Sequence, residues 1–271
     1  MTQLRNAPVV YVLGVLRFPE LIEPQPFAAA LQTKLRDVYP RQEVFTAPHF
    51  QVSIENSGVN FAKSEVTTWQ LASQDGSWAL MINAGHIAFH TNQYSDHIEF
   101  VERFAQCVEA AVAVPEVGIR FVHGIGLRYV DLIDPRGGEK LEDYLVEGFL
   151  PADISAAGLT VVDGVYAAGY STAVGALRVQ MFRRPPTVLP IDLNTEATQR
   201  SGWAPERPKG DFAVLDVDHG RPFEAPIGID EFDVRKRMIE LHGPIRNVFD
   251  ALVTPRALQV WNGENDGTGN L

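Results

Sequence analysis

The sequence predicts an α+β protein made of two similar halves, each with an antiparallel sheet packed against a long helix. Strand-like segments precede a long amphipathic helical stretch twice along the chain, an order typical of α+β folds. Asp75–Gly76 stands between two strand-like segments, and this dipeptide favours the tight turn of an antiparallel hairpin. The clearest strand signal, Gly118 to Asp134, is apolar on both faces, which predicts a central strand covered on both sides.

The composition is that of an ordinary globular protein. The chain has 271 residues, enough for one large domain or two small ones. Its formal net charge of -11 argues against a general nucleic-acid binder, which would need a basic surface. Because the start lacks a leader pattern and no apolar run approaches about 18 residues, we expect a cytoplasmic protein without a membrane span. The single cysteine, Cys107, excludes an internal disulfide.

Residues 1–134 form the predicted N-terminal half. Its strands show alternating apolar residues, and its helices show apolar residues at three- and four-residue spacing. Proline ends each helix because it removes a helical hydrogen bond, and Ser95 is the expected N-cap of the second helix. The predicted elements are a strand at 9–18, a helix at 26–40, strands at 50–55, 67–73, 78–83 and 86–91, a helix at 95–115 and the strand at 118–134.

Residues 135–155 are predicted to be a linker with a short helix, and residues 156–261 to form the C-terminal half. A proline-rich loop at 185–210 is long enough to be either functional or mobile, and Trp203 within it is expected to pack back onto the fold. The remaining predicted elements are strands at 159–172, 176–182 and 212–218, a helix from Asp230 that Gly243–Pro244 kinks or divides, a short helix from Thr254 to Trp261, and a disordered tail at 262–271.

Arg128 is the most distinctive residue of the central strand. Strand alternation places it with Val130 on one face, whereas His123, Leu127 and Tyr129 fall on the other. A buried guanidinium is costly unless it is paired, and its fork suits a carboxylate or a phosphate. Arg128 is therefore either one partner of an internal ion pair or the anchor of an anionic ligand.

A ligand pocket is expected between the sheet and a helix. Arg128 would be its anchor, Tyr129 or Trp69 would form its walls, and His123 lies close enough in sequence to take part. A small anionic or aromatic molecule would fit these residue types. In the alternative interpretation, the histidine and the aromatic residues are ordinary core residues whose polar atoms are satisfied.

Asp216 and Asp218 form a candidate metal site. Residues two apart on a strand share one face at about 6.6 Å, so both carboxylates could bind one divalent cation. A third ligand such as His242 would be required, and aspartates near a strand end are also common turn formers. The sequence contains none of the usual phosphate-binding, serine-hydrolase or zinc-protease motifs, and it provides no catalytic residue by pattern.

Several segments carry a resemblance to one family. They are NAPVVYVLGVLRF, WQLASQDGSWALMI, HTNQYSDHIEFVERF and GIGLRYVDLI. In these segments the chain resembles a bacterial family of uncharacterised proteins that is sporadically distributed among genomes, most sharply at Ala7–Pro8 and at the run from Gly126 to Tyr129. Asp131 stands where we expect Asn in relatives. The resemblance supports the fold, implies no activity, and suits a mobile or defence-related gene cassette.

The leading functional prediction is a non-catalytic module that binds a small ligand or another protein. One alternative is a metal-assisted hydrolase that uses Asp216, Asp218 and a histidine. The other is a self-associating structural protein, in which an exposed sheet edge forms a homodimer.

Overall fold

A computed structural model describes residues 4–55, 58–115, 118–152 and 154–263, with the backbone alone for 48–64. The predicted disordered tail lies outside the described residues from 264 onward. The strands are β1 (Val9–Arg17), β2 (Arg41–Glu55), β3 (Gly58–Ala72), β4 (Trp78–Ile82), β5 (His86–Thr91), β6 (Phe121–Ile133), β7 (Gly164–Ser171), β8 (Ala176–Arg183) and β9 (Ala213–Gly228). The helices are α1 (Pro24–Leu35), α2 (His97–Val112), α3 (Glu196–Arg200), α4 (Val234–Leu252) and α5 (Pro255–Asn262).

The fold is α+β, as predicted, with one nine-stranded antiparallel sheet. The strand order is β2-β3-β4-β5-β1-β6-β9-β8-β7, and every neighbouring pair is antiparallel. The two separate sheets expected from the sequence are joined, because β6 pairs with β1 on one side and with β9 on the other. Alternation shows which face of a strand is buried but not which strand is its neighbour, so the sequence could not distinguish one sheet from two.

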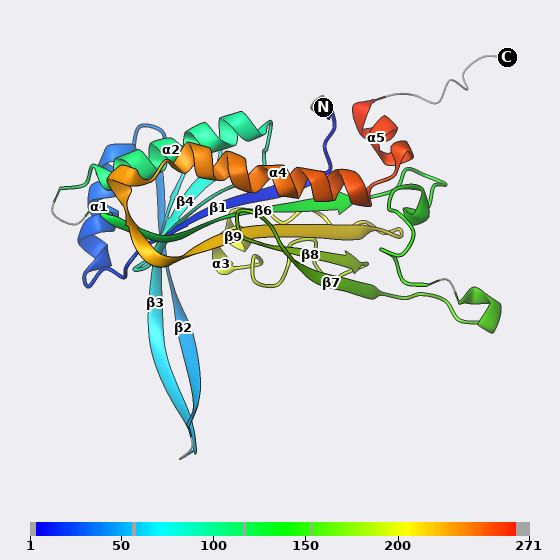
Figure 1. Ribbon diagram of the computed structural model, residues 1–271, viewed down its shortest axis with the longest axis horizontal. Coiled ribbons are helices and arrows are strands. Elements are labelled where there is room, and N and C mark those ends of the chain that lie inside the picture. Colours follow the sequence, from blue (N-terminus) through cyan, green and yellow to red (C-terminus); the bar gives the residue numbers. More distant parts are fainter. Residues whose placement is uncertain (1–3, 56–57, 116–117, 153, 264–271) are drawn as a thin grey trace.

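Helices α1, α2 and α4 lie on one face of this sheet (Figure 1). The main apolar core lies beneath them and includes Phe89, Phe100, Phe104 and Met238. Gly14 marks a close approach, since a Cβ there would lie 3.1 Å from Cε of Met238 and 3.2 Å from Cε1 of Phe100. Glycine at this position of β1 thus lets α2 and α4 pack side by side against the sheet.

The loop of residues 184–212, with α3 inside it, covers part of the opposite face. A second apolar cluster forms beneath it from Tyr11, Val130, Leu189, Trp203 and Phe212, among others. Trp203 is 2% exposed, and its indole Nε1 donates to the carbonyl oxygen of Gly76 at 2.6 Å. The prediction that Trp203 packs back onto the fold is confirmed.

Two predicted helix starts were misplaced by a few residues. Asp96, not Ser95, caps α2, because its carboxylate accepts from the backbone N–H of Glu99 at 2.8 Å. Asp233, not Asp230, caps α4 by accepting from the N–H of Lys236 at 3.0 Å. In each case the true cap is the residue whose side chain reaches the third helical amide.

Other predictions failed where local pattern does not decide the conformation. Of the two outcomes expected at Gly243–Pro244, a kink or a division, division is excluded, because helix α4 continues through Pro244 to Leu252. The predicted linker helix is only a 3-10 turn at Leu141–Asp143, followed by a bridge from Leu145 to Val253. Strands β2 and β3 are longer than expected, and their outer parts pair only with each other, so this hairpin projects from the sheet as an arm (Figure 1). None of the described helices combines the length and the apolar character needed to cross a bilayer.

Candidate functional site

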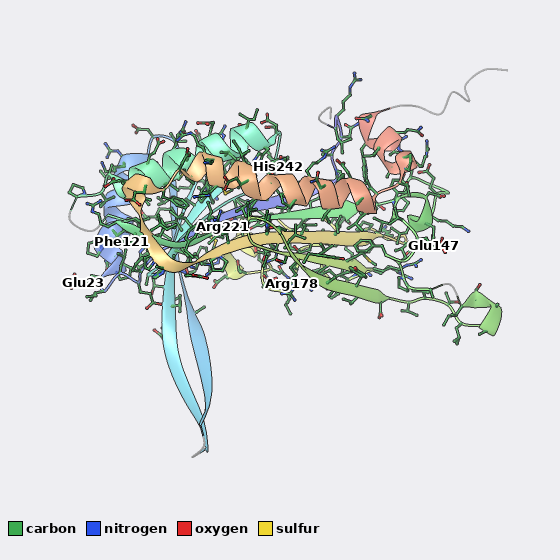
Figure 2. All side chains as sticks on the ribbon, in the orientation of Figure 1. Glu23, Phe121, Glu147, Arg178, Arg221 and His242 are labelled. Carbon is green, nitrogen blue, oxygen red and sulfur yellow. The ribbon has the colours of Figure 1, made fainter. Side chains whose placement is uncertain are left out.

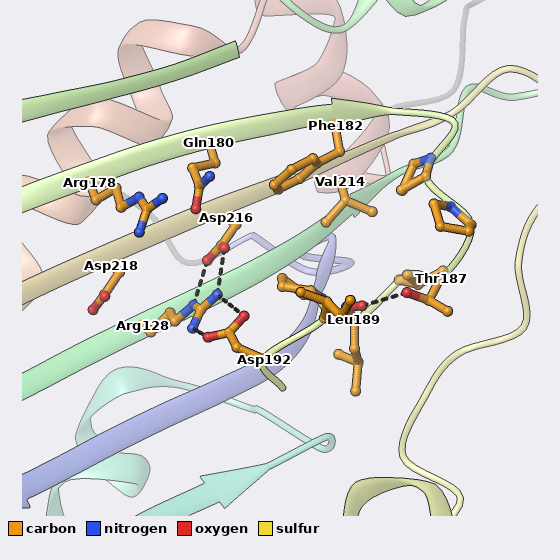
Figure 3. A pocket seen from close by; sticks show the side chains of 15 residues that line it. Arg128, Arg178, Gln180, Phe182, Thr187, Leu189, Asp192, Val214, Asp216 and Asp218 are labelled. Carbon is orange, nitrogen blue, oxygen red and sulfur yellow. Dashed lines mark hydrogen bonds and ion pairs between the residues drawn. The ribbon is translucent and has the colours of Figure 1, made fainter. Parts of the chain in front are cut away.

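Arg128 projects from β6 on the loop-covered side and is held by two carboxylates (Figure 3). Its Nε and Nη2 donate to the two oxygens of Asp216 on β9, both at 2.7 Å. Its Nη1 and Nη2 donate to Asp192 of the loop at 2.5 and 3.1 Å. The Asp216 side chain is almost fully buried, whereas that of Asp192 is 61% exposed. Of the two interpretations of Arg128, the structure shows the internal ion pair.

This arrangement leaves Arg128 little capacity for a ligand. A guanidinium has five N–H donors, and four hydrogen bonds already join this one to carboxylate oxygens. Burial lowers the pKa of Arg128, but the hydrogen bonds and charges of Asp216 and Asp192 outweigh burial, so the pKa is raised overall. We conclude that Arg128 fastens the loop to the sheet, and its role as a ligand anchor stays a prediction.

Two hollows adjoin the Arg128–Asp192 pair. The first, of about 420 Å³, is lined by Arg128 and Arg178 but also by three aspartates, so its charge does not favour an anion (Figure 3). The second, of about 490 Å³, has Arg17 and Arg221 on its walls. Arg128 and Asp192 both line each of the two hollows.

Trp69 and His123 lie elsewhere, along an open groove beside α1. His123 is exposed, contrary to the prediction that it shares a covered face with Leu127 and Tyr129. The cause is an irregularity in the β6–β9 register between Val122 and Gly124, which interrupts strand alternation at His123. The four predicted ligand residues therefore do not form one pocket, because Tyr129 faces the helices while Arg128 faces the loop.

The predicted metal site gains no support. Asp216 is engaged by Arg128, and Asp218 lies opposite Arg128 in the β6–β9 register. His242, the suggested third ligand, lies on α4 at the other face of the sheet, where its ring is near that of Tyr129 (Figure 2). Across the described ranges, no group of three or more His, Cys, Asp or Glu side chains could hold a metal ion.

A different cavity, which we call the helix-side pocket, lies between β6, α4 and the start of α2, and has a volume of about 720 Å³. Strand β6 contributes Tyr129 and Asp131, since residues two apart on a strand share a face. Segment 4–9 closes one side, and Ile245 and Phe249 of α4 add apolar wall. The other titratable residues that line the pocket are Tyr94, Asp96, His97, Glu99, His242 and Arg246.

A chain of polar contacts crosses the floor of this pocket. The hydroxyl of Tyr129 donates to that of Tyr94 at 3.2 Å, and Nδ1 of His97 lies 3.2 Å from the Tyr129 hydroxyl oxygen. The imidazoles of His97 and His242 stack with centroids 3.8 Å apart and planes 11° apart. Because Tyr129 donates its proton to Tyr94, Nδ1 of His97 is the donor to Tyr129, and its buried Nε2 is an acceptor without a partner.

Both imidazoles are neutral near pH 7. Burial lowers the pKa of His97 to about 3, with a further contribution from the charge of His242. Burial likewise lowers the pKa of His242 to about 4, and the positive charge of Arg246 acts in the same direction. The stacked pair therefore presents uncharged aromatic surface and acceptor nitrogen rather than positive charge.

Asp131 is the unusual residue of the pocket. It is 2% exposed, and its Oδ1 has no hydrogen-bond partner among the described residues. Burial raises the pKa of Asp131 to about 7, helped by the negative charge of Asp216 across the sheet and opposed by Arg246. Because a buried polar atom without a partner is costly, this oxygen is suited to accept a hydrogen bond from another molecule.

Sequence reasoning named Tyr129 of this pocket as a ligand residue, and it named His242 only as a possible metal ligand. Asp131 carried a usable signal, because it is a carboxylate on the same apolar strand face as Leu127 and Tyr129. His97 and His242 carried none, since they lie on different helices far apart in the chain and only the tertiary fold stacks them.

No family model, curated protein or solved structure matches this chain. The likeness to the sporadic bacterial family therefore stays a prediction, and only the geometry of the pocket bears on function.

Proposed function

We propose that this protein is a non-catalytic binding module that holds a small, largely aromatic molecule in the helix-side pocket. The unpaired Oδ1 of Asp131 is the observation that carries the proposal. A cavity of about 720 Å³ lies within the range of roughly 300–1,000 Å³ typical of small-molecule sites. Apolar walls around a few convergent polar atoms are the usual composition of such sites.

Binding is favoured over catalysis by the state of the polar groups. Imidazoles with pKa values of about 3 and 4 are weak bases at neutral pH, far from the range that general acid–base catalysis uses. Asp131 titrates in that range, but no nucleophile is hydrogen-bonded to its free oxygen in the described part of the chain.

The order of strands supports a relation between the two halves of the chain. On one side of the sheet centre the order is β1, β5, β4, β3, and on the other it is β6, β9, β8, β7. Helix α2 follows β5 as α4 follows β9. We infer that the halves arose by duplication and that the pocket lies between the two corresponding helices. Superposition of the Cα atoms of these units tests this relation.

Ligand-observed NMR with indole, a neutral aromatic probe, tests the binding function. Ala7 is exposed yet borders the pocket, so Ala7→Trp should obstruct the pocket without disturbing the core. Ile22, which is 99% exposed and does not line the pocket, provides the control Ile22→Trp. We expect saturation transfer to indole from the wild type and the control, and little from Ala7→Trp. No transfer from the wild type, or equal transfer from all three, contradicts the proposal.

Self-association is a second candidate, because β7 is an edge strand. Its outer side pairs with no other described strand, and Val165 and Tyr170 are exposed on it. Light scattering after size-exclusion chromatography would show a dimer that Val165→Lys dissociates. A monomer at high protein concentration contradicts this candidate.

A further inference from the structure

The charges around the helix-side pocket are unbalanced. Three carboxyl groups and one guanidinium line it. The guanidinium of Arg246 is held by Asp250, whose Oδ2 accepts from Nε at 3.0 Å, and Glu99 is held by Arg103 at 2.8 Å. Asp96 and Asp131 have no cation within ion-pair distance in the described ranges. The pocket therefore has negative charge that a cationic ligand would balance.

The start of α2 does not cancel this negative charge. A helix N-terminus has partial positive charge, but Asp96 caps this one, and Glu99 adds a second carboxylate in its first turn. The two nearby imidazoles are neutral, so they supply no cation either. The aromatic faces of Tyr94 and Tyr129 are themselves favourable neighbours for a cation.

Two buried hydrogen-bond acceptors belong to residues that line the helix-side pocket. Oδ1 of Asp131 and Nε2 of His97 both lack a partner, and both residues border the cavity. Each of these two atoms has almost no surface open to solvent, so a ligand reaches them only when the side chains turn toward the cavity. A ligand with two N–H donors could then satisfy both, whereas a ligand with one donor would leave one of them unsatisfied. A planar ligand also suits the rings in the lining, which belong to Tyr94, His97, Tyr129, His242 and Phe249.

We infer that the helix-side pocket takes a planar organic cation of the amidinium or aminopyridinium class, whose N–H groups donate to Oδ1 of Asp131 and Nε2 of His97. This inference rests on the proposed binding function and specifies its ligand. A charged N–H donor on a buried carboxylate forms one of the stronger hydrogen bonds in proteins, and it places the ligand's charge where the pocket lacks one.

Binding of such a cation should depend on pH through Asp131. The groups facing Asp131 are Asp216 from β9, Arg246 and His242 from α4, and His97 and Asp96 at the start of α2, together with Tyr129 of its own strand and Tyr94. The histidines titrate near 3 and 4, so the carboxyl of Asp131, near 7, controls the neutral range. The affinity should rise about tenfold between pH 6 and pH 8 and then level off.

Isothermal titration calorimetry with three molecules of one shape tests the inference. They are benzamidine, which is cationic, benzamide, which is neutral, and benzoate, which is anionic. We expect benzamidine to bind the wild type at least tenfold more tightly than benzamide, with benzoate undetected. Asp131→Asn should abolish the preference for benzamidine. Asp218→Asn, which removes a carboxyl from the other face of the same sheet, should leave it unchanged.

The outcomes separate the ligand class from the function. If indole binds but benzamidine binds no more tightly than benzamide, the ligand is not a cation of this class. The proposed binding function of the helix-side pocket is then still supported. Benzamidine that binds Asp131→Asn as tightly as the wild type would also contradict the cationic ligand without contradicting the binding function. If none of the four probes binds in a manner that Ala7→Trp blocks, the binding function itself is wrong. Should Asp131→Asn fail to fold, the pH dependence of the wild type decides, and a flat profile from pH 6 to 8 contradicts the inference.

Discussion

Arg128 and Asp131 lie three residues apart on β6, on opposite faces of the sheet, and both place a charged group out of water. The guanidinium of Arg128 is matched inside the chain by Asp216 and Asp192. The Oδ1 of Asp131 is matched by nothing in the described chain. A buried charge that the chain itself satisfies holds the fold together, whereas one left unsatisfied is suited to bind something else. The following predictions test this difference.

Asp216→Ala should have the largest effect, because it leaves the partly buried Arg128 with only the exposed Asp192. Removing one partner of a buried pair costs about 3–5 kcal/mol. Urea denaturation measures the loss of unfolding free energy. The double variant Arg128→Met with Asp216→Leu is the control, since it removes both charges and should recover much of the stability. A loss below about 1 kcal/mol in Asp216→Ala contradicts the structural role of the pair.

Asp131→Asn should act in the opposite direction and stabilise the free protein above pH 7. The carboxyl has a folded pKa of about 7, raised from its ordinary value of 3.8. Below pH 4 it is protonated in both states and adds no penalty. Between pH 4 and 7 it ionises in the unfolded state first, so the wild type loses stability as pH rises, by up to about 4 kcal/mol.

The predicted loss of stability can be measured as a change in unfolding free energy with pH. Unfolding free energies at pH 5 and pH 8 should differ less for Asp131→Asn than for the wild type, because the variant lacks the carboxyl that destabilises the folded state at high pH. A gain of up to about 4 kcal/mol at pH 8 is expected, with little change at pH 4. A variant that is less stable than the wild type at pH 8 would show that the carboxylate has an unseen partner.

Asp192→Asn should have the smallest effect. Its carboxyl is mostly exposed, and exposed ion pairs contribute about 0–1 kcal/mol. Denaturation midpoints should therefore nearly coincide with those of the wild type. The same variant also tests whether Arg128 can bind an anion, since it weakens the hold of residue 192 on the guanidinium. Benzoate should still not bind detectably, because Asp216 keeps two of the guanidinium donors. Tight benzoate binding would restore Arg128 as a ligand anchor.

The comparison also shows what sequence alone could predict. Strand alternation correctly separated Arg128 from Tyr129 and identified the central strand. Alternation failed at His123, where an irregular register breaks the rule, and it could not show that β6 joins both halves into one sheet. The partner of Arg128 could be named as an acid but not as Asp216 and Asp192, which tertiary contacts select.

The pocket was hidden for a similar reason. His97 begins one helix, and His242 lies within another that was expected to bend or break nearby. Only the close packing of α2 and α4 over Gly14 brings the two imidazoles together above Tyr129. Composition and local pattern do not contain that information, although the carboxylate of Asp131 on an apolar strand face could have prompted the search.

Direct titration of the Asp131 carboxyl by carbon-13 NMR, assigned by its absence in Asp131→Asn, tests the central claim most closely. The carboxyl of the free protein should titrate near pH 7, since burial without a partner raises its pKa. Saturating benzamidine should lower that pKa because the bound cation favours the carboxylate. A carboxyl that titrates near pH 4 in the free protein, or does not respond to benzamidine, would contradict the account.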